Sequence, residues 1–112
     1  MVDERILCIA NEYGYDAQSR QCIEEMAELT QAINKFWRKQ LRCGKVSLEG
    51  AGFRNEEYQN LVEEIADVEI MLEQMKVFMD CEDAVTEVVE EKLKRQIVTK
   101  DTPDLEHILV IL

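Results

Sequence analysis

Apolar residues recur every three or four positions over two long segments, and this spacing constrains the fold more than any other feature. In the first segment, from about residue 16 or 19 to residue 39, they are Ile23, Met26, Leu29 or Thr30, Ile33 and Trp37. In the second segment, from about residue 56 to residue 80, they are Tyr58, Leu61, Ile65, Val68, Leu72, Met75 and Met79. A repeat of this kind predicts two long amphipathic helices.

Shorter helices are expected before and after this pair. Asp3 favours the start of a first helix, which we expect to end near Gly14 because glycine tolerates a left-handed turn. A fourth helix follows a break at residues 81–83 and runs to about Gln96. The sequence therefore predicts an all-α protein, an antiparallel helical bundle of about four main helices.

Two segments depart from this helical pattern. Between residues 40 and 55 the periodicity fails and glycines accumulate, which predicts a long loop between helices two and three. Near the end of the chain, Thr102 and Pro103 favour the start of a short C-terminal helix. So short a helix needs a surface to pack on. We therefore divide the chain into a helical domain, 1–99, and an apolar segment, 100–112, that docks on the bundle or on a neighbouring subunit.

Composition limits the size of the fold and its partners. A chain of 112 residues is long enough for one domain. Its net charge of -11 disfavours nucleic acid and acidic membranes, and no apolar run approaches the roughly 20 residues that span a bilayer. The four cysteines show no CxxC spacing, and there is one histidine, so neither a zinc cluster nor a disulfide framework is indicated. We expect a cytoplasmic protein that binds neither nucleic acid nor membrane.

Two acidic clusters carry the functional signal. The first contains Glu24, Glu25 and Glu28, and the second contains Glu64 and Asp67. Carboxylates three residues apart lie within roughly 60° of each other around a helix, so they repel one another. Such repulsion suggests a compensating cation. The alternative is an ordinary solvated face, where most acidic runs are found.

An antiparallel hairpin of helices two and three would bring these clusters to the same level. At about 1.5 Å per residue, Glu28 and Glu64 both lie roughly 12 to 17 Å from the tip of the hairpin. Helix axes about 8 to 10 Å apart leave room for facing carboxylates to share an ion. Oxygen ligands without nearby histidine or cysteine favour magnesium, with manganese as an alternative. Because substrate phosphates usually complete a magnesium site, a diphosphate or triphosphate is the expected ligand.

The acidic clusters also resemble a known motif. Glu24-Glu25-x-x-Glu28 followed by Leu29, and Glu64-x-x-Asp67 followed by Val68, are similar to the paired motif of the MazG-like all-alpha nucleoside triphosphate pyrophosphohydrolases. The resemblance covers residues 3 to 97 in helix order, with a longer spacer between the motifs than is common in the family. It implies a homodimer or homotetramer that uses magnesium to cleave a nucleoside triphosphate to the monophosphate and pyrophosphate. Nucleotide-pool cleaning is the biological role that we expect.

The resemblance assigns roles to the acids. Glu25, Glu28, Glu64 and Asp67 match the positions that hold magnesium in the family, while Glu24, Glu28 and Glu64 are the candidate catalytic residues. Glu24 either binds a further metal ion or orients the attacking water. In this hypothesis magnesium screens the triphosphate and lowers the pKa of a water molecule, and a carboxylate takes the proton.

Basic and aromatic residues are candidates for substrate binding. Lys92 and Arg95 lie near the end of the fourth helix, where the family has basic residues, although the tips of such side chains also extend to solvent at ordinary helix ends. Lys35 lies two turns after the first acidic cluster and either binds phosphate or forms an ion pair. Phe36 and Trp37 could stack on a nucleobase, with core packing as the alternative for Trp37.

Two other functions remain open. One is phosphoribosyl-ATP pyrophosphohydrolase, which has a similar helical architecture and reaction type. The other is a non-catalytic helical interaction module that binds a partner protein through the apolar tail and the long loop. Turnover of different triphosphates distinguishes the first alternative, and an absence of pyrophosphate release distinguishes the second.

Overall fold

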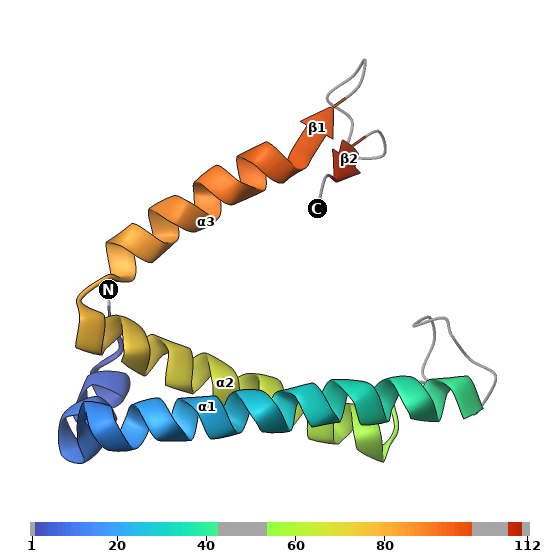
Figure 1. The fold of residues 1–112 in the computed structure, drawn as a ribbon, viewed down its shortest axis with the longest axis horizontal. Helices are drawn as coiled ribbons and strands as arrows, with labels where there is room; N and C mark the ends of the chain where they lie inside the picture. The colour runs from blue at the N-terminus through green and yellow to red at the C-terminus, as the bar shows by residue number, and fades with distance from the viewer. Residues whose placement is uncertain (1, 43–53, 100–107, 111–112) are drawn as a thin grey trace. The chain divides into compact units, whose positions relative to one another are not determined.

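The computed structural model describes residues 2–42, 54–99 and 108–110, and within these ranges the protein is mainly helical (Figure 1). The helices are α1 (Glu4–Arg42), α2 (Glu56–Met79) and α3 (Glu82–Gln96), and the strands are β1 (Ile97–Thr99) and β2 (Ile108–Val110). The all-α class predicted from the sequence is confirmed. The chain divides into two compact units, Met1–Met79 and Asp80–Leu112.

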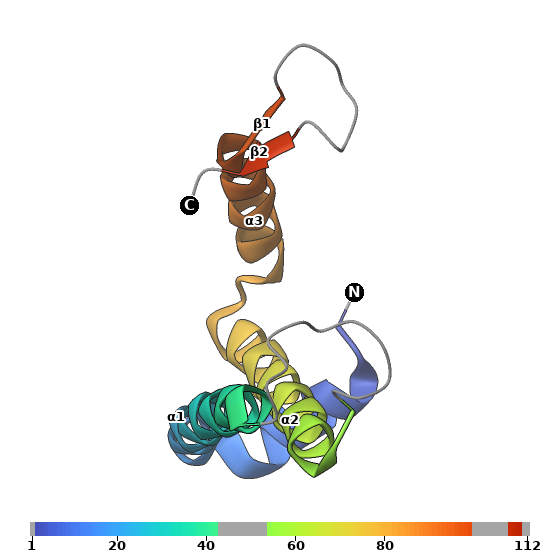
Figure 2. The same cartoon turned by 90° about the vertical axis from the view of Figure 1, so that its right-hand side faces the viewer.

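The first unit is an antiparallel hairpin of α1 and α2, which lie side by side in both views (Figures 1 and 2). The side chains between the helices form what we call the inner seam, spaced alternately by three and four residues, and all are buried or half-buried. The inner seam consists of Gln18, Cys22, Glu25, Leu29, Ala32 and Phe36 on α1, and Leu61, Glu64, Val68, Met71, Met75 and Phe78 on α2. This spacing keeps one face of each helix against the other along its length.

Two amide contacts align the helices within the hairpin. Gln18 Nε2 donates to Gln74 Oε1 at 2.8 Å, and Asn55 Nδ2 donates to Gln40 Oε1 at 3.0 Å near the other end. Gln40 and Gln74 are almost completely buried. Because a shift of either helix would separate these buried amides from their partners, the contacts specify the register of the pair.

Helix α1 joins the two helices that the sequence predicts before the loop. It begins after Asp3, whose Oδ1 accepts a hydrogen bond from the Arg5 backbone N–H at 2.8 Å. Gly14, with φ 83° and ψ 167°, is a non-helical residue inside α1. The expected helix end is therefore a kink, and only three helices are present among the described residues. The helix also continues to Arg42, beyond the expected end at residue 39, and residues 43–53 of the predicted loop lie outside the described residues.

The second unit contains α3 and a two-stranded antiparallel sheet. In its register Ile97 pairs with Val110, and Thr99 pairs with Ile108. The predicted short C-terminal helix is therefore wrong over Ile108–Val110; the remainder, 102–107 and 111–112, lies outside the described residues. Short helices are marginal, and β-branched residues favour an extended backbone, so pairing with β1 prevails here.

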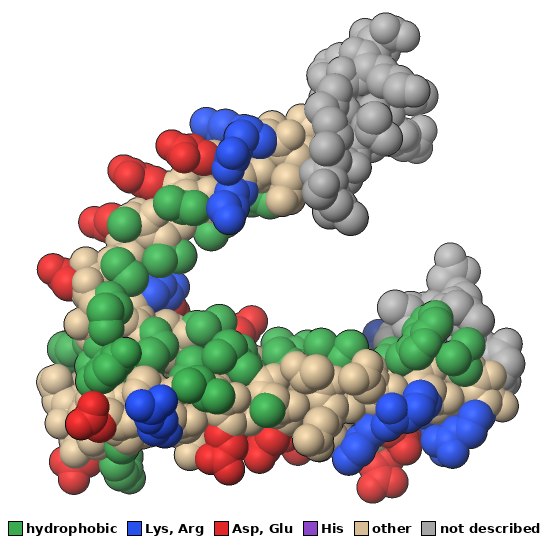
Figure 3. Space-filling model, in the orientation of Figure 1, with side chains coloured by type: hydrophobic (Ala, Val, Ile, Leu, Met, Phe, Trp, Pro, Cys, Tyr) green, Lys and Arg blue, Asp and Glu red, His purple; other side chains and the backbone are tan. Residues whose placement is uncertain are grey.

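Large apolar side chains lie exposed on one face of the hairpin, and we call them the outer seam. They are Ile23, Met26, Ile33, Trp37 and Leu41 on α1, and Val62, Ile65, Leu72 and Met79 on α2, each 41% to 56% exposed. In each case the residue directly before it faces the other helix or is at least half-buried. A one-residue step turns each helix by about 100°, and because the helices are antiparallel, both steps lead to the same face of the hairpin. Figure 3 shows hydrophobic side chains gathered along this hairpin, with charged side chains along its opposite edge.

Candidate metal centre

Three carboxylates meet between α1 and α2. Glu25 and Glu28 come from α1, Glu64 comes from α2, and one oxygen atom of each lies within 4.8 Å of the other two. Glu25 and Glu64 occupy inner-seam positions, where the other residues are mostly apolar, and Glu28 lies at the exposed edge. The prediction that an antiparallel hairpin places the two acidic clusters level with each other is confirmed.

Two carboxylate oxygens of this cluster have no hydrogen-bond partner among the described residues. Gln21 Nε2 donates to Glu25 Oε1 at 2.8 Å. The other oxygen, Glu25 Oε2, and Glu64 Oε2 are shielded from solvent and accept no hydrogen bond from any residue that the structure describes. A shielded carboxylate oxygen without a donor is costly, because it has lost its water and gained nothing in exchange. The two orphaned oxygens therefore present acceptor sites toward the space between the helices.

Burial and the neighbouring carboxylates disfavour the ionised form of Glu64. The pKa of Glu64 is raised above its ordinary value of 4.5, first by burial and then by the nearby charges of Glu28, Asp67, Glu25 and Glu63. Burial disfavours the charged carboxylate, and neighbouring carboxylates disfavour it further. A cation at this position would remove both penalties at once.

The donor set fits a hard divalent cation. All three side chains offer carboxylate oxygens, and the group contains neither histidine nor cysteine. Magnesium and manganese prefer such oxygens, whereas zinc and iron sites usually include nitrogen or sulfur. Three carboxylates also leave positions for water or for phosphate oxygens. The residues present are therefore suited to hold magnesium.

The two remaining predicted acids lie beside this triad. Asp67 is exposed one turn after Glu64, and its charge contributes to the raised pKa of that residue. Glu24 is exposed on α1 and is separated from Glu25 by about 100° around the helix. Both carboxylates are thus accessible from solvent at the edge of the cluster.

The aromatic and basic residues of α1 lie on different sides of the helix. Lys35 is exposed two turns beyond Glu28 on the same side, and Phe36 belongs to the inner seam. Trp37 is 50% exposed in the outer seam. Nine residues separate it from Glu28, which turns it about 180° away from the acids. Core packing, the alternative considered for Trp37, is therefore not seen among the residues that the structure describes.

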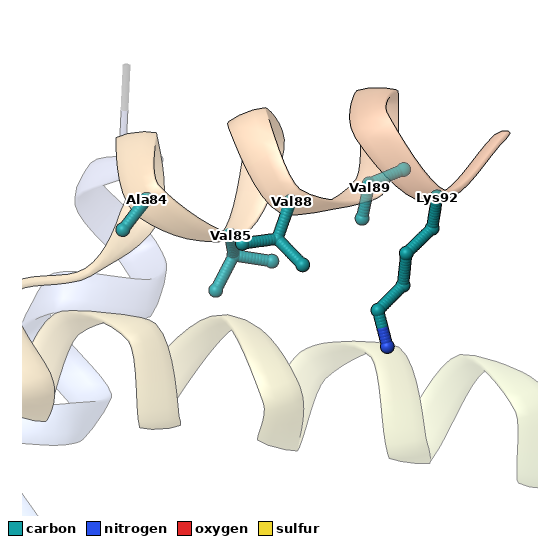
Figure 4. Close-up of a pocket in the computed structure, with 5 residues that line it drawn as sticks. All are labelled: Ala84, Val85, Val88, Val89 and Lys92. Atoms are coloured by element: carbon teal, nitrogen blue, oxygen red, sulfur yellow. The ribbon is translucent and has the colours of Figure 1, made fainter. Parts of the chain in front are cut away.

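The two basic residues of α3 belong to the second unit. Figure 4 shows Lys92 on the same side of the helix as Val85, Val88 and Val89, with which it lines a shallow hollow. Lys92 and Arg95 are both exposed within this unit. Their part in the centre stays a prediction.

Gln21 is the residue of the centre that sequence reasoning did not include. Its amide orients Glu25 and leaves the second oxygen of that carboxylate directed elsewhere. The signal was present, since Gln21 precedes Glu25 by four residues, the spacing at which helical side chains meet.

Comparisons with known proteins do not assign a function to this centre. No protein-family model, curated protein or solved structure matches the chain. None of the helices, within the residues that the structure describes, combines the length and apolar character needed to cross a bilayer. The resemblance to the MazG-like enzymes therefore remains a prediction based on the two acidic motifs.

Proposed function

We propose that the protein is a magnesium-dependent nucleoside triphosphate pyrophosphohydrolase of the MazG-like kind, releasing the nucleoside monophosphate and pyrophosphate. One observation carries the proposal. Glu25, Glu28 and Glu64 converge from two helices, and two of their shielded oxygens have no hydrogen-bond donor within the described part of the chain. A structural role alone does not account for acids at inner-seam positions, because an apolar residue there would avoid the cost of desolvation.

Each acid has a role in this proposal. Glu25, Glu28 and Glu64 would hold the metal, and Asp67 would add negative charge at its edge. When bound, magnesium, or manganese in its place, would neutralise triphosphate charge and make a water molecule more acidic. Glu24, which is exposed and adjoins Glu25 in the sequence, would accept the proton as the water oxygen bonds to phosphorus. The phosphoanhydride bond breaks and pyrophosphate leaves with the electron pair.

Other residues would bind the remainder of the substrate. Lys35 lies on the side of α1 that carries Glu28 and is the candidate on that helix for a phosphate contact. Phe36 could pack on the base at the edge of the inner seam, and Lys92 and Arg95 would supply cations from α3. Trp37 has the weakest case for base stacking, because it faces away from the acids.

The proposal also covers assembly and location. A homodimer or homotetramer is supported by the exposed apolar side chains of both hairpin helices. A cytoplasmic location is supported by Cys8, Cys22 and Cys81, which are all free thiols.

Pyrophosphate release from a panel of triphosphates tests the reaction. The panel should contain common and modified nucleoside triphosphates and phosphoribosyl-ATP, assayed with magnesium and again with chelator. We expect turnover that requires the metal, that is lost in Glu28→Gln, and that persists in Glu12→Gln, which removes an exposed acid elsewhere on α1. Preference for phosphoribosyl-ATP would assign the protein to that related reaction. Absence of pyrophosphate with every substrate would refute the proposal.

A non-catalytic interaction module is the second candidate, and the outer seam favours it. Such a module needs an exposed apolar surface, which the hairpin has. It does not need orphaned carboxylate oxygens between its helices. It predicts stable folding and association without pyrophosphate release under any metal condition.

A further inference from the structure

Basic residues gather near one end of α1, although the chain as a whole is acidic. The chain has 24 Asp and Glu against 13 Lys and Arg, yet the sequence from residue 29 to residue 48 contains no acid. Its basic residues are Lys35, Arg38, Lys39, Arg42 and Lys45, of which the first four belong to α1. This segment begins directly after Glu28, so an electropositive stretch of α1 adjoins the candidate metal centre.

Three of these cations lie on the same side of α1 as Glu28, and we call Lys35, Lys39 and Arg42 the basic row. They follow Glu28 by 7, 11 and 14 residues, so at about 100° per residue each lies within about 40° of it around the helix. At about 1.5 Å per residue they lie roughly 10, 17 and 21 Å beyond it. Figure 3 shows basic side chains gathered toward the C-terminal end of α1, on the edge of the hairpin opposite to its apolar side chains. The basic row therefore continues the line of the acids with the opposite charge.

The acids of the protein do not neutralise the basic row. Lys35 and Arg42 are exposed and Lys39 is half-buried, and none of the three forms an ion pair with a residue that the structure describes. Glu56 and Glu57 lie in the first turn of α2, at the same end of the hairpin, where they suit the dipole of their own helix. The dipole of α1 favours cations in its last turn, but Lys35 lies about two turns before Arg42. The basic row is therefore accessible to an external anion.

We propose that the basic row binds the outer part of a phosphate chain longer than a triphosphate, so that the preferred substrate is a nucleotide with four or more phosphates in one chain. This inference rests on the proposed function, because the metal centre would hold the phosphate that reacts and the basic row would hold the phosphates of the leaving group. A cation in each successive turn suits a continuous chain of negative charge better than one isolated phosphate. Helical side chains also lean toward the N-terminus of their helix, which directs the row back toward Glu28.

A longer chain leaves the proposed reaction unchanged except for its leaving group. The water oxygen bonds to the phosphorus next to the nucleoside and gives its proton to Glu24. The bond from that phosphorus to the bridging oxygen breaks, and the bridging oxygen leaves with the electron pair. With a nucleoside tetraphosphate the leaving group is inorganic triphosphate instead of pyrophosphate. The basic row would stabilise the negative charge that develops on this larger group.

Two arginines of α1 provide a matched test of the basic row. Arg42→Gln removes a cation of the row, and Arg20→Gln makes the same change at an exposed position on the other side of the acids. Calorimetric titration with inorganic pyrophosphate, triphosphate and tetraphosphate, with chelator present, measures binding without turnover. We expect affinity to rise with chain length, and the dissociation constant for tetraphosphate to rise about 3-fold in Arg42→Gln and about 10-fold when Lys39→Gln is added. Affinity independent of chain length, or an equal loss in Arg20→Gln, would overturn the proposal.

Turnover of adenosine tetraphosphate and ATP with magnesium provides the second measurement. The ratio of their kcat/KM values should exceed ~10 in the unsubstituted protein and should fall toward one, chiefly through KM, when Lys39→Gln and Arg42→Gln are combined. Chromatography should identify inorganic triphosphate as the product of the longer chain. A ratio near one in the unsubstituted protein would overturn the proposal, as would a stronger preference for an ATP that carries its further phosphate on the ribose. Absence of product with every nucleotide would refute the proposed function, and the titration without metal would still decide whether the basic row binds long phosphate chains.

Discussion

The inner and outer seams of the hairpin differ in polarity, and the difference is the reverse of what burial usually produces: the buried seam contains charged and polar side chains, and the exposed seam is apolar. The inner seam, which is buried, contains the carboxylates of Glu25 and Glu64 together with the Gln18 amide, and Gln74 is buried beside it. The outer seam, which is exposed, consists largely of isoleucine, leucine, valine, methionine and tryptophan. Polar groups are usually solvated and large apolar groups usually buried, so each seam requires its own explanation.

The hydrogen-bond partners of the buried polar groups distinguish a structural role from a functional one. Gln18 and Gln74 bond to each other, and such a pair specifies alignment. Glu25 Oε2 and Glu64 Oε2 have no hydrogen-bond partner among the described residues, and the proposed metal ion would supply that interaction. The outer seam is exposed among the described residues, and an apolar surface of this kind is typical of a binding interface. The inner seam therefore supports the proposed chemistry, and the outer seam supports the proposed association.

Replacing the central carboxylate should have the largest effect. Glu64→Gln keeps the size of the side chain but removes a negative ligand, so we expect metal-dependent pyrophosphate release to fall at least ~100-fold. Glu63→Gln, a change of the same kind at an exposed neighbour outside the triad, should retain most activity. Circular dichroism of both variants should match that of the unsubstituted protein. Full turnover by Glu64→Gln would remove this residue from the centre.

A smaller effect is expected from the amide that orients Glu25. Gln21→Met is nearly isosteric but cannot donate to Glu25 Oε1, so we expect magnesium affinity to fall roughly 10-fold. Turnover at saturating magnesium should change much less, because all carboxylate ligands remain. Calorimetric titration with magnesium measures the first quantity and a pyrophosphate assay the second.

Gln31→Met is the control for this change, since it makes the same substitution at an exposed position of α1. Equal losses of affinity in the two variants would show that the Gln21 hydrogen bond has no special part in metal binding.

The sequence predicts the helices and the level of the acids well, because helical spacing and chain rise are local properties. The sequence alone does not distinguish the inner seam from the outer seam, because Val68 and Leu72 both fit a single broad apolar face of the helix. Only the packing of α1 against α2 decides that Val68 is buried and Leu72 exposed. The sequence does not reveal the strand at Ile108–Val110 for another reason, because a short apolar run fits a helix or a strand equally well until its pairing with Ile97–Thr99 is known.

Metal-free stability should depend on pH through Glu64. Its pKa is raised in the folded protein, so the carboxyl takes up a proton more readily when folded than when unfolded. The stability that Glu64 contributes should be fully present below the ordinary pKa of 4.5 and should be lost as pH rises through the raised pKa. Glu64→Gln should flatten this dependence in thermal melts, whereas Glu12→Gln, which removes the same charge elsewhere, should preserve it.

Magnesium should reverse the sign of this pH dependence, because it binds the ionised carboxylates and stabilises the folded state more as they lose protons. Melts with magnesium should therefore show a melting temperature that rises with pH over the same window. An identical falling profile with and without magnesium would contradict a metal centre at Glu64.

The smallest expected effect concerns the polar pair of the hairpin. Gln74→Leu or Gln18→Leu leaves one amide without its partner, and each should lower the free energy of unfolding by about 1 kcal/mol. The double variant replaces both amides with apolar groups at adjoining positions, so it should recover most of the loss. Urea unfolding of the four proteins measures the coupling between the two residues. Additive losses would mean that the two amides act separately, and their hydrogen bond would then not specify the alignment of the helices.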